Sequence, residues 1–207
     1  MFGDFRHLPS WQNLSWLTGG LTAAGVLHPA DVSVTREASE STTSSFKPGA
    51  IVGGTPLELG AAFTTYAIGR AKWNPRVMSV GSELIRAQMM AQLVTTGVKQ
   101  AVRRQRPEGS GFSFPSGHTA VTFASATVLR QHFGWKVGIA SYAVASYVAA
   151  SRVQMQRHYL SDVVFGATVG IVAGRTVTIG SGRNKFQLGP TVVPGGGGVS
   201  AVWIGQR

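Results

Sequence analysis

The sequence predicts an all-α fold, an antiparallel bundle of about six helices with a small C-terminal β-hairpin. Apolar stretches of helical length alternate with short breaks that contain Gly, Pro or Ser, and several stretches begin with helix-start signals. Strand-like composition is found near the C-terminal end, where residues 185–193 and 199–204 flank Pro194 and four glycines. With 43% apolar residues, the chain can order a core of its own.

The composition limits the classes of protein to consider. The 207 residues include no cysteine, which excludes disulfides, cysteine-ligated metals and thiol nucleophiles. Lysine and arginine number 19 against 8 acidic residues, and the formal charge of +11 indicates an anionic partner such as a phosphate, an anionic lipid surface or nucleic acid. From Gly109 to Arg207 the one acidic residue is Asp162, which makes this carboxylate a candidate functional group.

We expect a single domain in three parts. Residues 1–54 hold a first helix, predicted at 11–27, and a connector at 31–47 that is rich in Ser and Thr and too polar for the core. Residues 55–180 form the helical core, and residues 181–207 form the hairpin tail.

The helices of the core are placed by their start and stop signals. Thr55–Glu58 reads as a capping box with proline at the first helical position, and predicts a helix to about Ile68 with Gly69 as its stop. Asn74 followed by proline predicts a long helix that continues to Gln105. A short Gly/Ser loop at 108–115 and three more helices follow, at 118–132, from 135 into the 150s, and at about 159–176.

The membrane signals are weak. The start of the chain, MFGDFRHLPS, has no secretory pattern, which leaves export open because a removed leader would look the same. The best apolar windows, 137–151 and 163–174, are shorter than the roughly 20 residues of a spanning helix. We expect a helical domain that is soluble or lies at a membrane surface, with an integral membrane bundle as the alternative. Gly166, Gly170 and Gly174 form two overlapping GxxxG units and indicate a tight helix contact, in a bilayer or outside one.

Basic residues gather at the end of the long helix. Lys99 and Arg106 are seven residues apart and project from one helical face, which Arg103 joins and Arg104 does not. Cations stacked on one face repel each other, so either an anion lies between them or they are solvated at a helix end.

The segment Phe114–Thr119 offers an anion site at a helix start. Ser116 can cap the helix or donate its hydroxyl, and Gly117 lets the backbone approach a ligand closely. His118 would then lie beside a bound anion, where it could give a proton to a leaving group; alone, it reads as a polar helix-start residue.

His158 and Asp162 are spaced to share one helical face. The carboxylate can accept from one imidazole nitrogen and leave the other with a free lone pair, as in a dyad whose nucleophile is histidine. The alternative is an ordinary helix side-chain pair, which is less favoured because Asp162 is so isolated as an acid.

Together, the three segments resemble the signature motifs of the type 2 phosphatidic acid phosphatase superfamily, K-x6-R-P, P-S-G-H and S-R-x5-H-x3-D. The order and the internal spacings agree over roughly residues 55–176. The matching residues are Lys99, Arg106, Pro107, Pro115, Ser116, Gly117, His118, Ser151, Arg152, His158 and Asp162.

The resemblance implies a phosphatase that needs no metal or other cofactor and works through a phosphohistidine. It implies that His158 attacks phosphorus, that Asp162 orients it, and that His118 protonates the leaving oxygen and then activates water. The expected phosphate-binding residues are Lys99, Arg106, Ser116, Gly117 and Arg152. Arg103, outside the family pattern, and Ser151 are expected beside them.

Several functions remain open at this point. The first is a lipid phosphatase of the phosphatidic acid or polyprenyl pyrophosphate type in the cell envelope, periplasmic or membrane-associated; a soluble acid phosphatase is the alternative for small esters. The family is also similar to vanadium haloperoxidases, for which vanadate would be the cofactor rather than an inhibitor, but only eight residues separate Pro107 from Ser116. A non-catalytic module for anionic lipid is the last alternative, and no nucleic-acid motif is present.

Overall fold

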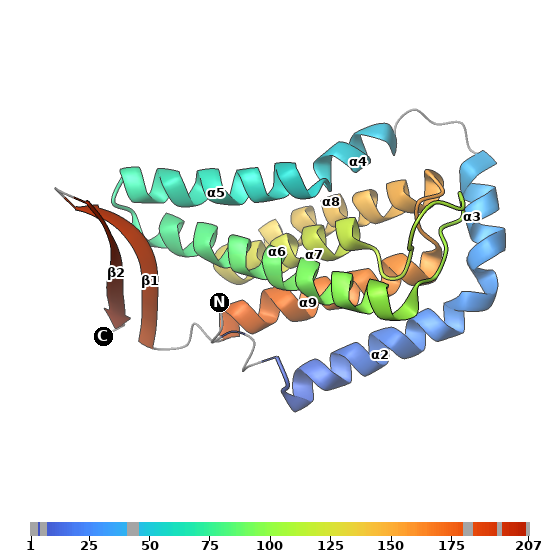
Figure 1. The fold of residues 1–207 in the computed structure, drawn as a ribbon, viewed down its shortest axis with the longest axis horizontal. Helices are drawn as coiled ribbons and strands as arrows, with labels where there is room; N and C mark the ends of the chain where they lie inside the picture. Colours follow the sequence, from blue (N-terminus) through green and yellow to red (C-terminus); the bar gives the residue numbers. More distant parts are fainter. Residues whose placement is uncertain (1–3, 5–7, 41–45, 180–183, 194–195, 206–207) are drawn as a thin grey trace.

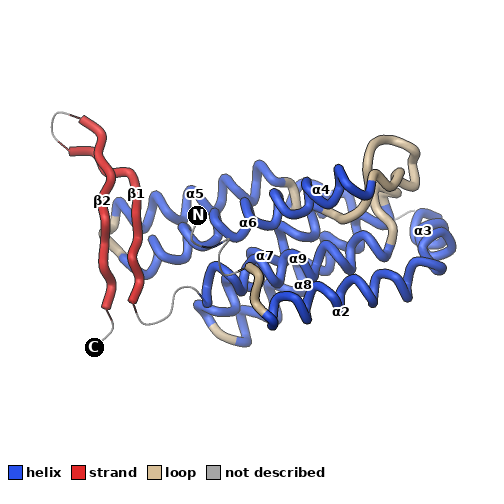
Figure 2. Tube along the Cα trace, turned by 60° about the horizontal axis from the view of Figure 1, so that its bottom comes forward, coloured by secondary structure: helices blue, strands red, loops and turns tan. Residues whose placement is uncertain are grey.

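The structure, a computed structural model, describes residues 4, 8–40, 46–179, 184–193 and 196–205. Within these residues it is an elongated helical bundle, as Figures 1 and 2 show, and the all-α prediction is confirmed. The helices are α2 (Trp11–Leu27), the 3-10 turn η1 (His28–Ala30), α3 (Asp31–Glu40), α4 (Lys47–Val52), α5 (Thr55–Ala71), α6 (Pro75–Val102), α7 (Gly117–Phe133), α8 (Trp135–Gln154) and α9 (Leu160–Ile179).

The C-terminal part of the chain forms two strands, drawn in red in Figure 2. β1 (Asn184–Val193) pairs antiparallel with β2 (Gly196–Gly205), and Asn184 lies opposite Gly205 in the register. The connecting residues 194–195 and the side chains of both strands lie outside the described residues.

Helix α5 begins where predicted, but its start is not a capping box. Gly54, which precedes it, supplies no side-chain cap, and Glu58 turns inward, where its carboxylate accepts a hydrogen bond from Ser125 Oγ at 2.7 Å. The helix also continues past Gly69. Glycine is needed there for close packing, because an added Cβ would lie 2.4 Å from the backbone nitrogen of Met78 at the start of α6.

The predicted polar connector is wrong for residues 31–40, which form α3. Asp31 in the first turn interacts favourably with the helix dipole, and it is 1% exposed. Thr35, one turn later, is also buried, so one face of this Ser/Thr-rich helix packs against the bundle. Residues 41–45 of the predicted connector lie outside the described residues.

Helix α6 ends at Val102, three residues before the predicted end. Asn74 caps its start as expected, because its side chain accepts from the backbone nitrogens of Arg76 and Val77. At the other end Arg103 adopts a left-handed conformation with φ of 52°, which stops the helix and redirects the chain. The residues after Val102 therefore do not continue the helical face that spacing alone predicted.

Helix α7 lies at the centre of the bundle, in contact with α6, α8 and α9 (Figure 2). The predicted tight helix contact is confirmed as the packing of α7 against α9: a Cβ at Gly166 would lie 2.6 Å from the carbonyl oxygen of Ser116, and one at Gly170 would lie 2.3 Å from that of Ala120. The backbone nitrogen of Ser116 also donates to the carbonyl oxygen of Asp162 at 3.0 Å. This contact fixes the starts of α7 and α9 side by side.

Candidate active site

One end of the bundle collects the residues that the sequence singled out. Figure 1 shows there the loop between α6 and α7, the turn between α8 and α9, and helix α3 beside them. These segments are far apart in sequence, and the antiparallel order of the helices returns each of them to the same end.

The α7 start forms the expected helix-cap geometry. Ser116 is fully buried and precedes the helix, and its Oγ accepts from the backbone nitrogen of Thr119 at 3.4 Å and from the Thr119 hydroxyl at 2.9 Å. The first N–H groups of a helix have no acceptor within it, so Gly117 and His118 present their backbone donors where an anion could bind.

His158 and Asp162 face each other, although they do not share a helix as predicted. His158 lies in the turn before α9, and the helix begins two residues later. Its Nδ1 lies 3.7 Å from Asp162 Oδ2, longer than a hydrogen bond, while the same oxygen accepts from the backbone nitrogen of Tyr159 at 2.8 Å. Both side chains are almost fully buried. Because Nδ1 faces the carboxylate, Nε2 is the nitrogen left for chemistry.

The three predicted phosphate-binding cations lie around this pair in different ways. Lys99 donates all three of its protons to the carbonyl oxygens of the loop before α7, at 2.9–3.1 Å, and so holds that loop in place. The Arg106 side chain lies half-buried in the same loop. Arg152 is 7% exposed, and its Nε is a buried donor without a hydrogen-bond partner among the described residues.

The electrostatics show that these groups form one cluster. Burial first, and then the charges of Arg152, His158, Arg106 and Lys99, lower the pKa of His118 to about 4. Burial also lowers the pKa of His158, against the opposing effect of Asp162, and lowers the pKa of Lys99 to about 8. Both imidazoles are therefore neutral at pH 7 without an anion, and Lys99 remains mostly charged.

Two of the predicted site residues are not part of this cluster. Arg103 is exposed, and its Nε donates to the carbonyl oxygen of Gln100, so it points away from the buried groups. Ser151 is fully buried, but its hydroxyl donates to the carbonyl oxygen of Val148, and it packs against Gly49 of α4. Arg103 lies outside the buried cluster because α6 ends before it.

Sequence reasoning missed three polar residues beside the pair, of which one contacts Asp162 directly. Arg104, which the helical projection placed away from the site, donates to Asp162 Oδ1 at 3.0 Å. Asp31 and Ser161 contact Arg104 from α3 and α9. The signal that could have found Arg104 is a further arginine inside the K-x6-R-P motif, two residues before Arg106.

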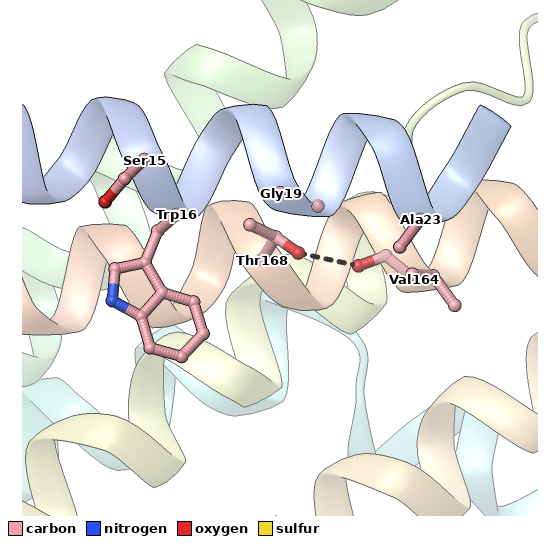
Figure 3. Close-up of a pocket in the computed structure, with 7 residues that line it drawn as sticks. Ser15, Trp16, Gly19, Ala23, Val164 and Thr168 are labelled. Atoms are coloured by element: carbon pink, nitrogen blue, oxygen red, sulfur yellow. Dashed lines mark hydrogen bonds between the residues drawn. The ribbon is translucent and has the colours of Figure 1, made fainter. Parts of the chain in front are cut away.

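A surface hollow between α2 and α9 is separate from this site. Figure 3 shows Trp16 at its rim and the hydrogen bond from Thr168 Oγ1 to the carbonyl oxygen of Val164, 3.1 Å long. The hollow has a volume of about 390 Å³, and none of the predicted site residues lines it. Among the described residues, no group of three or more His, Asp or Glu side chains is placed to hold a metal ion.

The fold and the site define a class: helical-bundle proteins that bring two imidazoles, a buried carboxylate and several cations together at one end of the bundle. The chain belongs to the PAP2 superfamily, whose profile matches residues 82–186. The match contains all three motifs, from Lys99 to Asp162.

Two curated relatives each match about half of the chain. Over 111 residues it is 39% identical to a lipid A 1-phosphatase of Porphyromonas gingivalis, covering 51% of this chain and 24% of the relative. Over 109 residues it is 31% identical to a decaprenylphosphoryl-5-phosphoribose phosphatase of Mycobacterium tuberculosis, covering 47% of this chain and 60% of the relative. The chain thus spans less than two thirds of the length of either relative.

Two crystal structures share the fold. The transmembrane PAP2 type phosphatidylglycerolphosphate phosphatase of Bacillus subtilis superposes with a TM-score of 0.69 at 20% identity, over 83% of this chain and 96% of that one. Aquifex aeolicus LpxE superposes with a TM-score of 0.62 at 20% identity, over 72% and 95%. The similarity extends beyond the matched motifs to the arrangement of the bundle.

Proposed function

We propose that this protein hydrolyses the phosphate ester or pyrophosphate of a lipid through a phosphohistidine intermediate, without a metal ion. The observation that carries the proposal is the clustering of His118, His158 and Arg152 at one end of the bundle, where Arg152 and His158 lower the pKa of His118 and Arg152 lowers that of His158. The curated relatives named above are phosphatases of phosphorylated lipids, which supports the same reaction here.

The geometry supports a two-step reaction. In the first step the lone pair of His158 Nε2 forms a bond to phosphorus, the bond from phosphorus to the lipid oxygen breaks, and His118 gives that oxygen its proton. In the second step water attacks phosphorus, His118 takes the proton from the water, and the N–P bond breaks to release inorganic phosphate. Asp162, which faces Nδ1, stabilises the charge that develops on His158.

Two properties of the cluster favour the binding of an anion. Arg152 has a buried Nε donor with no partner among the described residues, so an oxygen of the phosphate would satisfy it. Binding of a phosphate also adds negative charge beside His118 and opposes the effect of the surrounding cations. The pKa of His118 therefore rises from about 4 on binding, and the imidazole can hold the proton that the first step needs.

The outer surface supports membrane association. Apart from α6, which carries Glu83 and Arg86, the long helices have no Asp, Glu, Lys or Arg in their middle, and large apolar side chains are exposed along the helices. Examples are Leu21, Phe63, Leu93 and Ile139, all more than half exposed. One helix of the described residues, at 160–178, has the length and hydropathy of a membrane span, and 72% of it is buried inside the bundle. We propose that this apolar belt faces lipid in the cell envelope.

Aromatic and basic residues gather at the opposite end of the bundle from the site. Trp73, in the turn between α5 and α6, and Trp135, at the start of α8, are 81% and 66% exposed. Arg70 lies 5.9 Å from the ring of Trp73, and Lys136 lies 5.8 Å from the ring of Trp135. Such side chains are typical of a membrane–water interface, which supports binding of this end at a lipid headgroup layer.

A turnover panel tests the proposal. The purified full chain is assayed in detergent micelles for phosphate release from a phosphatidic acid, a polyprenyl pyrophosphate and a soluble aryl phosphate. We expect the lipids to be hydrolysed with much higher kcat/KM. Equal kcat/KM for the aryl phosphate, with no effect of detergent, would instead indicate a phosphatase for small soluble esters.

The intermediate and the location need separate measurements. Substrate labelled with ³²P should leave an acid-labile, base-stable label on the protein, and this label should be lost in His158→Gln and retained in His28→Gln, which changes an exposed histidine. Membranes washed with alkaline carbonate should retain the chain; release by the wash would contradict an embedded belt.

A further inference from the structure

A buried polar cluster adjoins the His158–Asp162 pair and has no role in the reaction above. It joins Asp31 at the start of α3, Arg104 in the loop after α6, and Ser161 in the first turn of α9. Asp31 Oδ1 accepts from the Ser161 backbone nitrogen at 2.8 Å, and Oδ2 accepts from Ser161 Oγ at 2.5 Å and from Arg104 Nη2 at 2.8 Å. Both carboxylate oxygens are therefore occupied by donors.

Arg104 bridges two carboxylates. Its Nη2 contacts Asp31, and its Nη1 donates to Asp162 Oδ1 at 3.0 Å and to Ser161 Oγ at 2.8 Å. The guanidinium also stacks over the ring of Tyr159, 4.0 Å from its centroid. The two aspartates are 1% and 0% exposed at the side chain, so this contact is shielded from solvent and from salt.

The cluster fixes the carboxylate that faces the nucleophile. Asp162 Oδ1 is held by Arg104, and Oδ2 is held by the Tyr159 backbone nitrogen while it faces His158 Nδ1. A carboxylate held at both oxygens cannot rotate freely about its last bond. The carboxylate that faces His158 is thus held by contacts that begin on α3 and in the loop after α6.

The charges in the cluster explain why two acids accompany one arginine. A guanidinium beside Asp162 alone would cancel the negative charge that stabilises an imidazolium at His158. Because a guanidinium is not deprotonated in proteins, the compensation has to come from another group. Asp31 supplies it, because two carboxylates and one guanidinium leave one net negative charge next to the imidazole.

We propose that Arg104 and Asp31 are positioning residues for the nucleophile, Arg104 by fixing the Asp162 carboxylate and Asp31 by offsetting the charge of Arg104. This inference rests on the proposed function for its kinetic consequences. Neither residue is expected to touch the phosphate, so both should act on kcat rather than on the binding of an oxyanion.

The chain provides a matched control, because Arg103 is the exposed neighbour of Arg104. We expect Arg104→Gln to lower kcat by about tenfold to a hundredfold with KM for the lipid and affinity for orthovanadate nearly unchanged, and Arg104→Lys to recover part of the loss. Arg103→Gln should match the wild type. Equal kcat for the Arg103 and Arg104 variants would overturn the proposal, and so would a loss of vanadate affinity in Arg104→Gln with kcat unchanged.

A second variant pair covers the case in which Arg104→Gln does not fold, since that change leaves two buried carboxylates close together. Asp31→Asn should lower kcat by about tenfold, because it leaves the charge of Arg104 uncompensated. The double variant Asp31→Asn/Arg104→Gln restores the single negative charge of Asp162 and should be more active than Asp31→Asn alone. A double variant that is less active than Asp31→Asn would contradict the charge argument.

A titration separates this inference from the proposed function. The protein with ¹³C-labelled histidine is titrated by NMR, and the signal of His158 is assigned with His158→Gln. The charged groups facing His158 are Asp162, Lys99 and Arg152. In Asp31→Asn we expect the proton affinity of His158 to fall by about tenfold, whether or not the wild type releases phosphate. An unchanged titration overturns the role of Asp31, whereas a wild type without turnover overturns the proposed function alone.

Discussion

Two histidine–carboxylate pairs lie at opposite ends of the same bundle, and they differ in what surrounds them. At the far end His132 Nε2 lies 2.8 Å from Glu83 Oε2, and Ser79 Oγ donates to the other oxygen at 2.9 Å. At the site end His158 lies 3.7 Å from Asp162, and the charges of Lys99 and Arg152 also act on the imidazole. The closer pair joins α6 to α7, and the looser one leaves its imidazole available. In the proposed reaction it is therefore the pair with the longer distance that does the chemistry.

The largest contrast is expected from removal of the two imidazoles. His158→Ala should abolish turnover, with a loss of at least about a thousandfold in kcat, because it removes the nucleophile. His132→Ala should keep kcat within about twofold of the wild type. Steady-state assays of lipid hydrolysis check both. Turnover that persists in His158→Ala would eliminate histidine as the nucleophile.

The next contrast concerns two arginines, each with a buried Nε that lacks a partner among the described residues, Arg152 at the site and Arg175 at the far end. Arg152→Ala should lower kcat/KM by about a hundredfold, because it removes a donor aimed at the phosphate. Arg175→Ala should leave kcat/KM unchanged, since Arg175 lies against the ring of Trp16. Comparable losses in the two variants would show that the effect comes from packing.

A smaller effect should appear in the pH dependence of oxyanion binding. The pKa of His118 is about 4 in the free protein, so at about pH 6 the imidazole is neutral and binding of orthovanadate should take up a proton. Affinity should therefore increase as the pH falls toward the pKa of His118, and decrease as the pH rises past the pKa of Lys99 at about 8.

Calorimetry in two buffers of different ionisation enthalpy measures this proton uptake. His118→Gln should remove the uptake that exceeds the protonation of vanadate itself, and His132→Gln should not. Identical uptake in the wild type and in His118→Gln would place the proton on another group.

The smallest effect on activity, and the clearest on stability, is expected at the far end. His132→Ala removes a close partner of Glu83, which is 1% exposed, and should lower the free energy of unfolding by about 1–3 kcal/mol. Thermal melting in detergent, compared with His28→Ala, measures the difference. Equal melting temperatures would show that the His132–Glu83 contact is energetically neutral.

Much of the fold could be predicted because the signals for it are local. The bounds of α2 agree with the prediction, and those of α7 differ from it by one residue at each end, since apolar runs and caps are read within a few residues. Helix α3 was missed because its sequence is mostly Ser, Thr and charged residues, and only one narrow face is buried. No apolar periodicity marks such a helix.

The site could be predicted because its residues match known motifs. The error in the prediction lies at the end of α6. His118, His158, Asp162 and Arg152 lie together as the motif resemblance implies, although their spacing in sequence does not itself determine the distances. Arg104 was assigned to the wrong side because one residue with positive φ ended α6 early. A single backbone angle of this kind depends on tertiary contacts and leaves no trace in composition.

The backbone hydrogen bond from Ser116 to the Asp162 carbonyl and the close packing of Gly166 against Ser116 join the starts of α7 and α9. We call this contact the α7–α9 seam. It connects the segment that carries His118 to the segment that carries His158. Variation in this seam would alter the spacing of the two imidazoles, so libraries aimed at new substrates should leave it untouched.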